Sequence, residues 1–485
     1  MSIRQKIYAS LRPDALVAFW LGVWWICNLF QAGFTELAND EAYYHMFAEN
    51  LAWGYFDHPP MTALLVWLGE HLFGGELGVR FFFTVLQPLY LYILWRIIRP
   101  ADADRRDAAL FVVLSAATLM LQLYGFIAVP DGPLMMTAAL FLLTFKWFTE
   151  GRRAAWLWMG VAMALMAYSK YHGALVVLFA LAATPPRLFL RPTLYLSGAV
   201  ALLLLVPHFV WQYEHDWASL AYHLAGRNSV FRPNYVAEYL LNLLVVFNPF
   251  FVPLYVKAWI AVKPQNAVER ALKFIPVAFI VFFLLSTFRG YVQPQWVIVA
   301  VFGLIYTLFT YARRHSRTRR YLMRMGWVTL ALIALTRLVM IFNPLGIRYE
   351  VFDNRTSYGR SPKSPTAVPS FSATVTPLQP NTPSIPAERP TASPISATGP
   401  TNGSSVTTIR ALPAAKCWSR RLMTKPTRRA ASGRRTAQRQ AFHVVRRYAF
   451  PSDPPCGHLL HGASRTSCRG RYAAAFAANR KSLSL

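Results

Sequence analysis

Cysteine is scarce in this sequence. The chain has four cysteines, Cys27, Cys417, Cys456 and Cys468, and no two of them have the C-x-x-C spacing of a zinc or redox site. Cys27 lies in an apolar run, whereas the other three lie near the carboxyl end. This pattern predicts neither a zinc site nor a disulfide framework.

Acidic residues are also few. The chain of 485 residues has 21 Asp and Glu against 50 Lys and Arg, which gives a formal net charge of +29. A charge of this size would suit a nucleic-acid partner. However, the positive charges gather after residue 400 and in short segments between apolar runs, which is a pattern of membrane topology. We therefore expect no nucleic-acid partner.

Long apolar runs dominate the first part of the chain. Hydrophobic residues make up 55% of the sequence, and its mean hydropathy is +0.31. A run of about 20 apolar residues can cross a bilayer, and five long apolar runs follow one another at 11–34, 79–98, 108–129, 134–148 and 154–168. The first run is long, rich in Trp and without a small-residue cleavage site, so it is no cleaved signal peptide. We expect an all-α polytopic membrane protein.

One orientation fits about eleven predicted spans. Basic segments such as 99–106, 152–153 and 313–320 would lie in the cytoplasm together with the amino terminus, and the acidic first loop would lie outside. This loop is expected to be amphipathic, with a helix over 41–53. In a bacterium the chain would lie in the inner membrane with its functional loop in the periplasm, and residues 1–350 would form the membrane domain.

The composition changes near the carboxyl end. Residues 351–485 are first rich in Pro, Ser and Thr and then in Arg and Ala. Such a segment cannot bury a core, so we expect a disordered tail. An alternative is translation out of the true frame, because GC-rich coding DNA read in the wrong frame gives a similar composition. Neither interpretation gives the tail a catalytic role.

A cluster of polar residues follows the first apolar run. Segment 39–61 reads NDEAYYHMFAENLAWGYFDHPPM and includes Asp40, Glu41, Asp57 and His58. Charged groups at the end of a membrane span are costly unless they are solvated or used. Asp40 could cap a helix or act as a general base. Adjacent carboxylates diverge on a helix, so only one of Asp40 and Glu41 could reach a substrate.

This segment resembles the first periplasmic loop of the protein O-mannosyltransferase-like superfamily. The combination DE…YFDHPP is fairly specific, and further segments resemble the family in the same order: VPDGPL at 129–134, SKYHGAL at 169–175, YHLAGR at 222–227 and VQPQW at 292–296. The family consists of polytopic glycosyltransferases of the GT-C fold and includes the bacterial aminoarabinose lipid A transferases. The resemblance covers about residues 10–350.

The resemblance implies an inverting transfer of a sugar from a polyprenyl-phosphate donor to a periplasmic acceptor, such as lipid A or another glycolipid or glycan. The essential acid of the family corresponds to Asp40, and Glu41 and Asp131 are further catalytic candidates. Asp131 would orient the acceptor, although Pro-Asp-Gly is also an ordinary turn. Polyprenyl phosphate leaves as a stabilised anion, so the reaction needs a base and positive charge rather than a strong acid.

Four basic side chains are candidates for binding the donor phosphate: Lys170, Arg227, Arg289 and Arg337. Lys170 could instead extend its charge to the membrane surface. Arg289 could grip a phosphate with its planar fork or anchor its span at the interface. Arg337 lies inside a predicted span, where an Arg is either paired or functional.

Aromatic and histidine side chains are expected to line the substrate pocket: Tyr44, Tyr55, His58, Tyr171, His172 and Trp296. In the aminoarabinose transferases a metal is held near the corresponding loop acid and by a later histidine. The resemblance therefore implies Asp57 or His58, together with His223, as candidate ligands of a divalent metal. Histidines that only donate hydrogen bonds are the alternative, because ligands on separate loops are a weak signal.

A transporter or flippase of a lipid-linked sugar is the alternative function. Transporters typically have internal repeats and polar groups in the middle of the membrane. This sequence shows no repeat, and its acids cluster in an outer loop. Glycosyl transfer is therefore favoured, with a lipid-linked sugar, a lipid or glycan acceptor and membrane lipids as partners.

Overall fold

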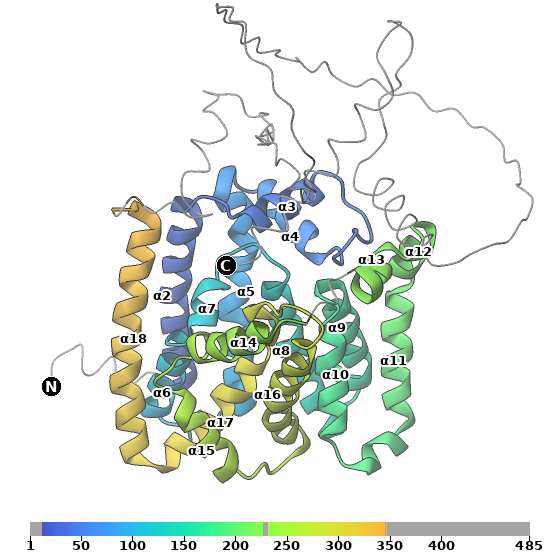
Figure 1. Ribbon diagram of the computed structural model, residues 1–485. Helices are drawn as coiled ribbons and strands as arrows, with labels where there is room; N and C mark the ends of the chain where they lie inside the picture. The colour runs from blue at the N-terminus through green and yellow to red at the C-terminus, as the bar shows by residue number, and fades with distance from the viewer. Residues whose placement is uncertain (1–11, 227–230, 345, 347–485) are drawn as a thin grey trace, which may run out of the picture. The chain divides into compact units, whose positions relative to one another are not determined.

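The computed structural model describes residues 12–226, 231–344 and 346. The regular elements in this part of the chain are helices, and no strand occurs among them (Figure 1). The predicted all-α class is therefore confirmed. The predicted tail, residues 351–485, lies outside the described residues.

Several helices match the length of a membrane crossing. A pair of helices, α11 (Pro192–Leu204) and α12 (Val206–Glu214), meets at 47° and would count as one broken span. In the part of the chain that the structure describes, four single helices are long and apolar enough to cross a membrane: α2 (Pro13–Phe34), α5 (Gly75–Ile98), α8 (Asp131–Thr149) and α18 (Ser316–Phe342). A multi-pass membrane protein is therefore confirmed, whereas the count of about eleven spans is not.

Further helices of the described part are shorter or more polar. Their bounds are α6 (Arg105–Ala116), α7 (Leu119–Leu123), α9 (Ala155–Ser169), α10 (Gly173–Ala182), α13 (Ala218–Ala221), α14 (Pro233–Val246), α15 (Val252–Ala261), α16 (Ala267–Ser286) and α17 (Ala300–Arg314). Single turns of 3-10 helix lie at Pro186–Leu190 and Pro294–Val297, and a π-helical turn lies at Tyr222–Gly226.

Two of the predicted spans are interrupted. The apolar run 108–129 is divided between α6 and α7. The apolar residues of about 236–260 also predict one span, and it is divided between α14 and α15. Asn248 lies at the second interruption with a φ of 71°. Its side-chain amide donates to the carbonyl of Ala117 at the first interruption and to the hydroxyl of Thr329 on α18, both at 3.0 Å. The buried side chain of Asn248 thus donates to a backbone carbonyl that has no helical partner at the break between α6 and α7.

The core lies between α5, α6 and α17. Trp95 is fully buried, and its ring centroid lies 5.3 Å from that of Phe111 and 5.9 Å from that of Phe309. Its indole N–H donates to Asp14 Oδ1 at 2.7 Å. The start of α2 is therefore attached to the end of α5.

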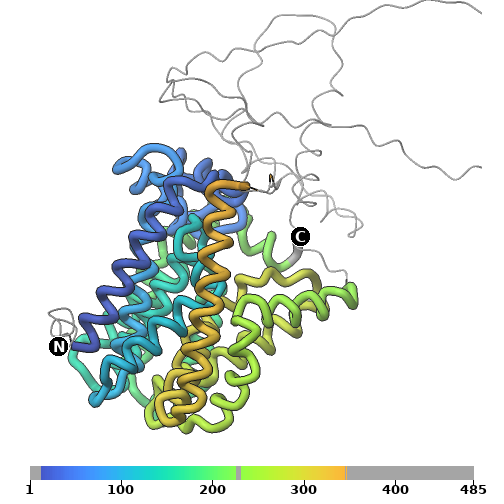
Figure 2. Tube along the Cα trace, turned by 90° about the vertical axis from the view of Figure 1, so that its left-hand side faces the viewer, coloured from blue at the N-terminus to red at the C-terminus, as the bar shows by residue number. Residues whose placement is uncertain are grey.

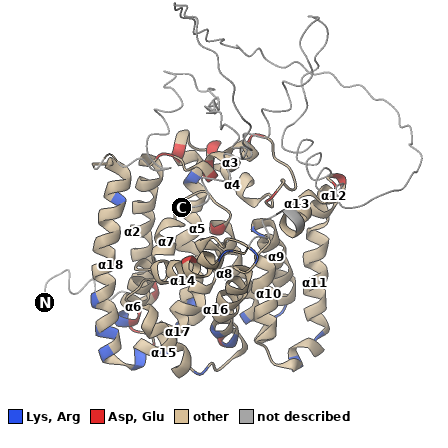
Figure 3. Cartoon of the chain, in the orientation of Figure 1, with Lys and Arg blue, Asp and Glu red and all other residues tan. Residues whose placement is uncertain are grey.

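Charge is divided between the two ends of the bundle. Helices α3 (Asn39–Ala48) and α4 (Met61–Glu70) lie at the upper end in Figure 1. Figure 2 shows α2 and α18 close together at the α3 end and farther apart toward the other end of the bundle. Most Lys and Arg of the described part gather toward the end away from α3 (Figure 3). This division agrees with the predicted alternation of loops, while the side that faces the cytoplasm stays a prediction.

Helices α16 and α17 approach closely at Gly303. Pro276 lies inside α16 and has no N–H, so the carbonyl of Leu272 loses its usual partner in the helix. A Cβ atom added at Gly303 would collide with this carbonyl and with the ring of Pro276. Glycine therefore allows α17 to pack directly against the interrupted turn of α16.

We expect Gly303→Val to lower the melting temperature of the detergent-solubilised protein, because overpacking of this kind costs about 1–3 kcal/mol. The matched control is Gly198→Val on α11, where an added Cβ would meet nothing within 4 Å. Equal melting temperatures for the two variants would contradict the close contact between α16 and α17.

Candidate functional site

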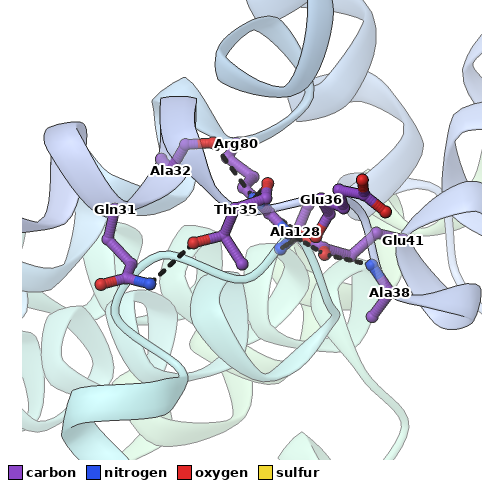
Figure 4. A network of polar contacts seen from close by, with 8 residues as sticks. All are labelled: Gln31, Ala32, Thr35, Glu36, Ala38, Glu41, Arg80 and Ala128. Atoms are coloured by element: carbon purple, nitrogen blue, oxygen red, sulfur yellow. Dashed lines mark hydrogen bonds and ion pairs between the residues drawn. The ribbon is translucent and has the colours of Figure 1, made fainter. Parts of the chain in front are cut away.

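A buried ion pair fixes the start of α3. Glu41 and Arg80 are both fully buried, and Arg80 Nε donates to Glu41 Oε1 at 2.6 Å while its Nη2 donates to Oε2 (Figure 4). Glu41 Oε2 also accepts from the backbone N–H of Ala38 at 2.9 Å, and Oε1 accepts from that of Ala128 at 2.8 Å. The glutamate therefore joins α3 to α5 and to the segment before α8.

Arg80 also closes the end of α2. Its two terminal nitrogens donate to the backbone carbonyls of Ala32, Thr35 and Glu36 at 3.1, 2.6 and 2.8 Å. Together with the two bonds to Glu41, these contacts use all five N–H groups of the guanidinium. A cation at the carboxyl end of a helix is also favoured by the helix dipole.

The expected catalytic role of Glu41 is corrected to a structural one. Its side chain has no exposed surface, and both carboxylate oxygens already accept two hydrogen bonds each. A substrate could reach this carboxylate only if the ion pair were broken, and an unpaired buried Arg80 would be costly.

Asp40 faces a different environment. The N-cap of α3 is Ala38, so Asp40 lies within the first turn and does not cap the helix. Among the residues that the structure describes, its carboxylate has no hydrogen-bond or ion-pair partner. Part of Asp40 is open to solvent, yet the surrounding protein and the negative charges of Asp57 and Asp131 raise its pKa, which the nearby His58 partly opposes.

Asp57 and His58 form the polar turn opposite Asp40. His58 Nδ1 lies 2.9 Å from Asp57 Oδ1, and the hydroxyl of Tyr43 donates to the same oxygen at 2.9 Å. Burial alone would raise the pKa of Asp57, but His58 and this hydroxyl together hold it below its usual value. The hydroxyl of Tyr44 lies 3.2 Å from His58 Nε2. Asp57 is thus an anion with partners, in contrast to Asp40.

The proposed metal ligands do not fit a metal site. His223 Nε2 approaches the backbone oxygen of Asp57 at 2.9 Å rather than its carboxylate, and His58 is engaged by Asp57 and Tyr44. In the described part of the chain, no three His, Cys, Asp or Glu side chains are placed to hold a metal ion. The histidines instead hold the turn in place.

Asp131 and Lys170 pair with each other. Lys170 Nζ donates to both carboxylate oxygens of Asp131, at 2.8 and 2.9 Å, and both residues are buried. Asp131 begins α8 and Lys170 follows α9, so the pair links the outer ends of two helices. The structure therefore brings together two predicted residues that the sequence had placed in separate roles.

Two predicted pocket tyrosines support the loop. The hydroxyl of Tyr55 donates to the carbonyl of Phe47 at 3.0 Å, and its ring stacks on that of Phe47 with centroids 4.1 Å apart. Tyr55 thereby holds the end of α3. The hydroxyl of Tyr171 accepts from Gln212 at 3.0 Å and lies 3.3 Å from His208 Nε2, which ties the outer end of α9 to α12.

The remaining predicted pocket residues cluster beside α16. The ring of His172 lies 5.2 Å from those of Phe283 and Trp296, and Trp296 donates from its indole N–H to Gln293 at 2.9 Å. These aromatic groups form a wall rather than a charged site. The structure does not describe Arg227.

The two other predicted phosphate ligands differ in their surroundings. Arg289 is exposed after α16 and has no side-chain partner among the described residues. Arg337 donates to Asn28 Oδ1 at 2.7 Å and to the carbonyl of Gln122 at 2.9 Å, and its guanidinium lies 5.5 Å from the ring of Phe126. Arg337 therefore attaches α18 to the bundle through Nη2, while its Nη1 is buried without a hydrogen-bond partner among the described residues. Its predicted role at the phosphate stays a prediction.

Arg80 was not among the predicted site residues. It lies within the apolar run 79–98, and an Arg in such a run is the same signal that had pointed to Arg337. Tyr43 and His208 were also not predicted. Tyr43 lies in segment 39–61 and contacts Asp57 of the same segment, whereas His208 contacts Trp53 from a part of the chain 155 residues away.

Comparison with known proteins defines the class. Residues 57–211 match the family model described as dolichyl-phosphate-mannose-protein mannosyltransferase. This segment begins at Asp57 and includes Asp131 and Lys170, but not Asp40. Together with the fold, the match indicates a membrane glycosyltransferase of the GT-C type, and the resemblance noted in the sequence is confirmed.

Two solved structures of ArnT from Cupriavidus metallidurans share the fold. The apo structure aligns with a TM-score of 0.53 and the structure bound to undecaprenyl phosphate with 0.51. Each is 18% identical in sequence to this protein. Each alignment covers 67% of this chain and 72% of the ArnT chain. No curated protein matches the sequence.

We expect Glu41→Gln to destabilise the protein by about 3–5 kcal/mol, because it leaves the buried guanidinium of Arg80 without a counter-charge. Thermal unfolding in detergent would measure the loss, with the exposed Glu49→Gln as a matched control on the same helix. In a double-mutant cycle with Arg80→Met, the two losses should not add. Additive losses would show that the two side chains do not depend on each other.

Proposed function

We propose that this protein transfers a sugar from a polyprenyl-phosphate donor to a hydroxyl or phosphate of an acceptor at the α3 end of the bundle, with Asp40 as the general base. The observation that carries the proposal is the contrast among the acids of this end. Glu41, Asp57 and Asp131 each have partners, whereas Asp40 has none among the described residues.

The chemistry requires a group that accepts one proton. As the acceptor oxygen attacks the anomeric carbon from the face opposite the phosphate, the bond between that carbon and the phosphate oxygen breaks and the configuration inverts. The acceptor proton passes to Asp40, and the lipid phosphate leaves as an anion. Because its surroundings raise the pKa of Asp40, this carboxylate is a better base than an ordinary aspartate.

Positive charge near the base would stabilise the departing phosphate. Lys170 uses two of its three N–H donors on Asp131, and the third remains for a ligand. Arg289 is exposed and could move toward the phosphate. Arg227 completes the proposed set, although it lies outside the described residues. In this assignment Asp131 positions Lys170, and through it the donor or the acceptor.

The donor class is supported by the similarity to ArnT, which has been solved with undecaprenyl phosphate bound. We assign this chain a donor of the same chemical kind and an acceptor such as lipid A, another glycolipid or a glycan. The proposed orientation places α3 in the periplasm and the basic end of the bundle in the cytoplasm of a bacterial inner membrane, in agreement with the division of charge.

We expect Asp40→Asn to lower the rate of sugar transfer by about 10²–10⁴-fold, because this is the usual contribution of a general base. Donor consumption in proteoliposomes measures the rate, and binding of the lipid-linked donor should be unchanged. Glu49→Gln, an exposed acid at the other end of α3, is the matched control and should keep full activity.

Transfer at the normal rate by Asp40→Asn would contradict the assignment of the base. A flippase would give a different result. The intact lipid-linked sugar would cross the membrane at the same rate in the wild type and in both variants, and no sugar would be transferred.

A further inference from the structure

A second polar site lies at the basic end of the bundle. A cavity of about 580 Å³ opens between the ends of α5 and α8 and the segments that follow them. Its lining contains four cations and no acid: the residues are Tyr92, Ile93, Arg96, Arg99, Ala101, Leu143, Lys146, Trp147 and Arg152. None of these residues takes part in the proposed transfer.

Two of the four cations are already paired. Arg99 Nε lies 3.1 Å from Asp14 Oδ1, and Arg152 Nη2 lies 2.8 Å from Glu150 Oε2. The two carboxylates partly offset the charges of Arg99 and Arg152.

Arg96 and Lys146 leave the cavity with about two uncompensated positive charges. Lys146 Nζ has only a long contact of 3.4 Å with the carbonyl of Ile97, and Arg96 is exposed with no side-chain partner among the described residues. The carboxyl ends of α5 and α8 carry partial negative charge. An anion would therefore be bound by these side chains and not by helix backbone.

The rest of the cavity suits the region between lipid headgroups and acyl chains. Tyr92 and Trp147 are amphipathic aromatic residues of the kind found at membrane interfaces, and the Arg152 guanidinium lies 5.6 Å from the ring of Trp147. Ile93 and Leu143 add an apolar wall.

An apolar path leads away from the cavity along α5. Leu89, Ile93 and Arg96 recur at helical spacing and so share one face of this helix. Leu89 is 46% exposed, which is typical of a side chain that faces acyl chains. This face of α5 thus presents a cation at the membrane surface and apolar side chains below it. It matches a phospholipid, whose charged headgroup lies above its acyl chains.

We propose that this cavity binds the phosphate headgroup of an anionic phospholipid, held by Arg96 and Lys146. Basic pockets between membrane helices are a known form of lipid recognition. The bound lipid would stabilise the ends of α5 and α8, because its phosphate offsets the repulsion between the two cations. The site lies at the opposite end of these helices from Asp131 and Asp40, so it is separate from the donor site.

Native mass spectrometry and lipid titration of the full-length protein test this proposal. The protein is placed in phosphatidylcholine nanodiscs, and phosphatidylglycerol is added in steps. We expect retained phosphatidylglycerol and a rise in melting temperature. The double variant Arg96→Gln/Lys146→Gln should bind it roughly fivefold more weakly for each charge removed. Arg187→Gln, an exposed cation of the same end that does not line the cavity, should bind it normally.

Two results would overturn the proposal. One is unchanged binding of phosphatidylglycerol by the double variant. The other is displacement of the lipid by an equal concentration of inorganic phosphate, since this would identify a site for free anions. If the double variant does not fold, Lys146→Gln alone is compared with Arg187→Gln, and a helical circular dichroism spectrum confirms that both are intact.

Discussion

The candidate site depends on the buried pair of Glu41 and Arg80. Two charges removed from water are stable only when their remaining hydrogen-bonding groups are also satisfied. Here the guanidinium donates all five N–H groups and the carboxylate accepts four hydrogen bonds. The pair connects the end of α2, the start of α3, α5 and the segment before α8, so these elements keep fixed positions relative to one another.

This arrangement also determines what Asp40 can do. The two acids are neighbours on α3 and must point in different directions, so the inward direction of Glu41 turns Asp40 away from the core. Burial by the surrounding protein is the largest cause of the raised pKa of Asp40, and the charges of the partnered Asp57 and Asp131 raise it further. The raised pKa of this base thus has two sources: the protein that surrounds Asp40 and the neighbouring acids that serve the structure.

The class of protein could largely be predicted from the sequence, because long apolar runs and the sign of the charge in each loop are local features. The helical membrane fold and the glycosyltransferase resemblance are of this kind. The resemblance pointed to Asp40 as the essential acid of the DE pair, but the structural role of Glu41 could not be predicted. The partner of Glu41 lies 39 residues away, and no local pattern distinguishes an acid that meets Arg80 from one that does not.

The same limit applies to the cations. Lys170 and Arg337 were expected at a phosphate because each lies in or beside an apolar run. The structure gives them nearby partners from other helices, Asp131 for Lys170 and Asn28 for Arg337. Helix breaks such as the one at Asn248 could not be located for the same reason, since the groups that satisfy them come from distant segments. Long-range pairing, not composition, decides which charges remain for a ligand.

The most direct measurement for the central claim is the pH dependence of sugar transfer by the wild-type protein and by Asp57→Asn. If Asp40 is a free base among neighbouring anions, the rate should fall as the pH drops through an inflection above the usual aspartate value. Removal of the charge of Asp57 should move that inflection to lower pH. An inflection at the ordinary aspartate value in both proteins would contradict the account.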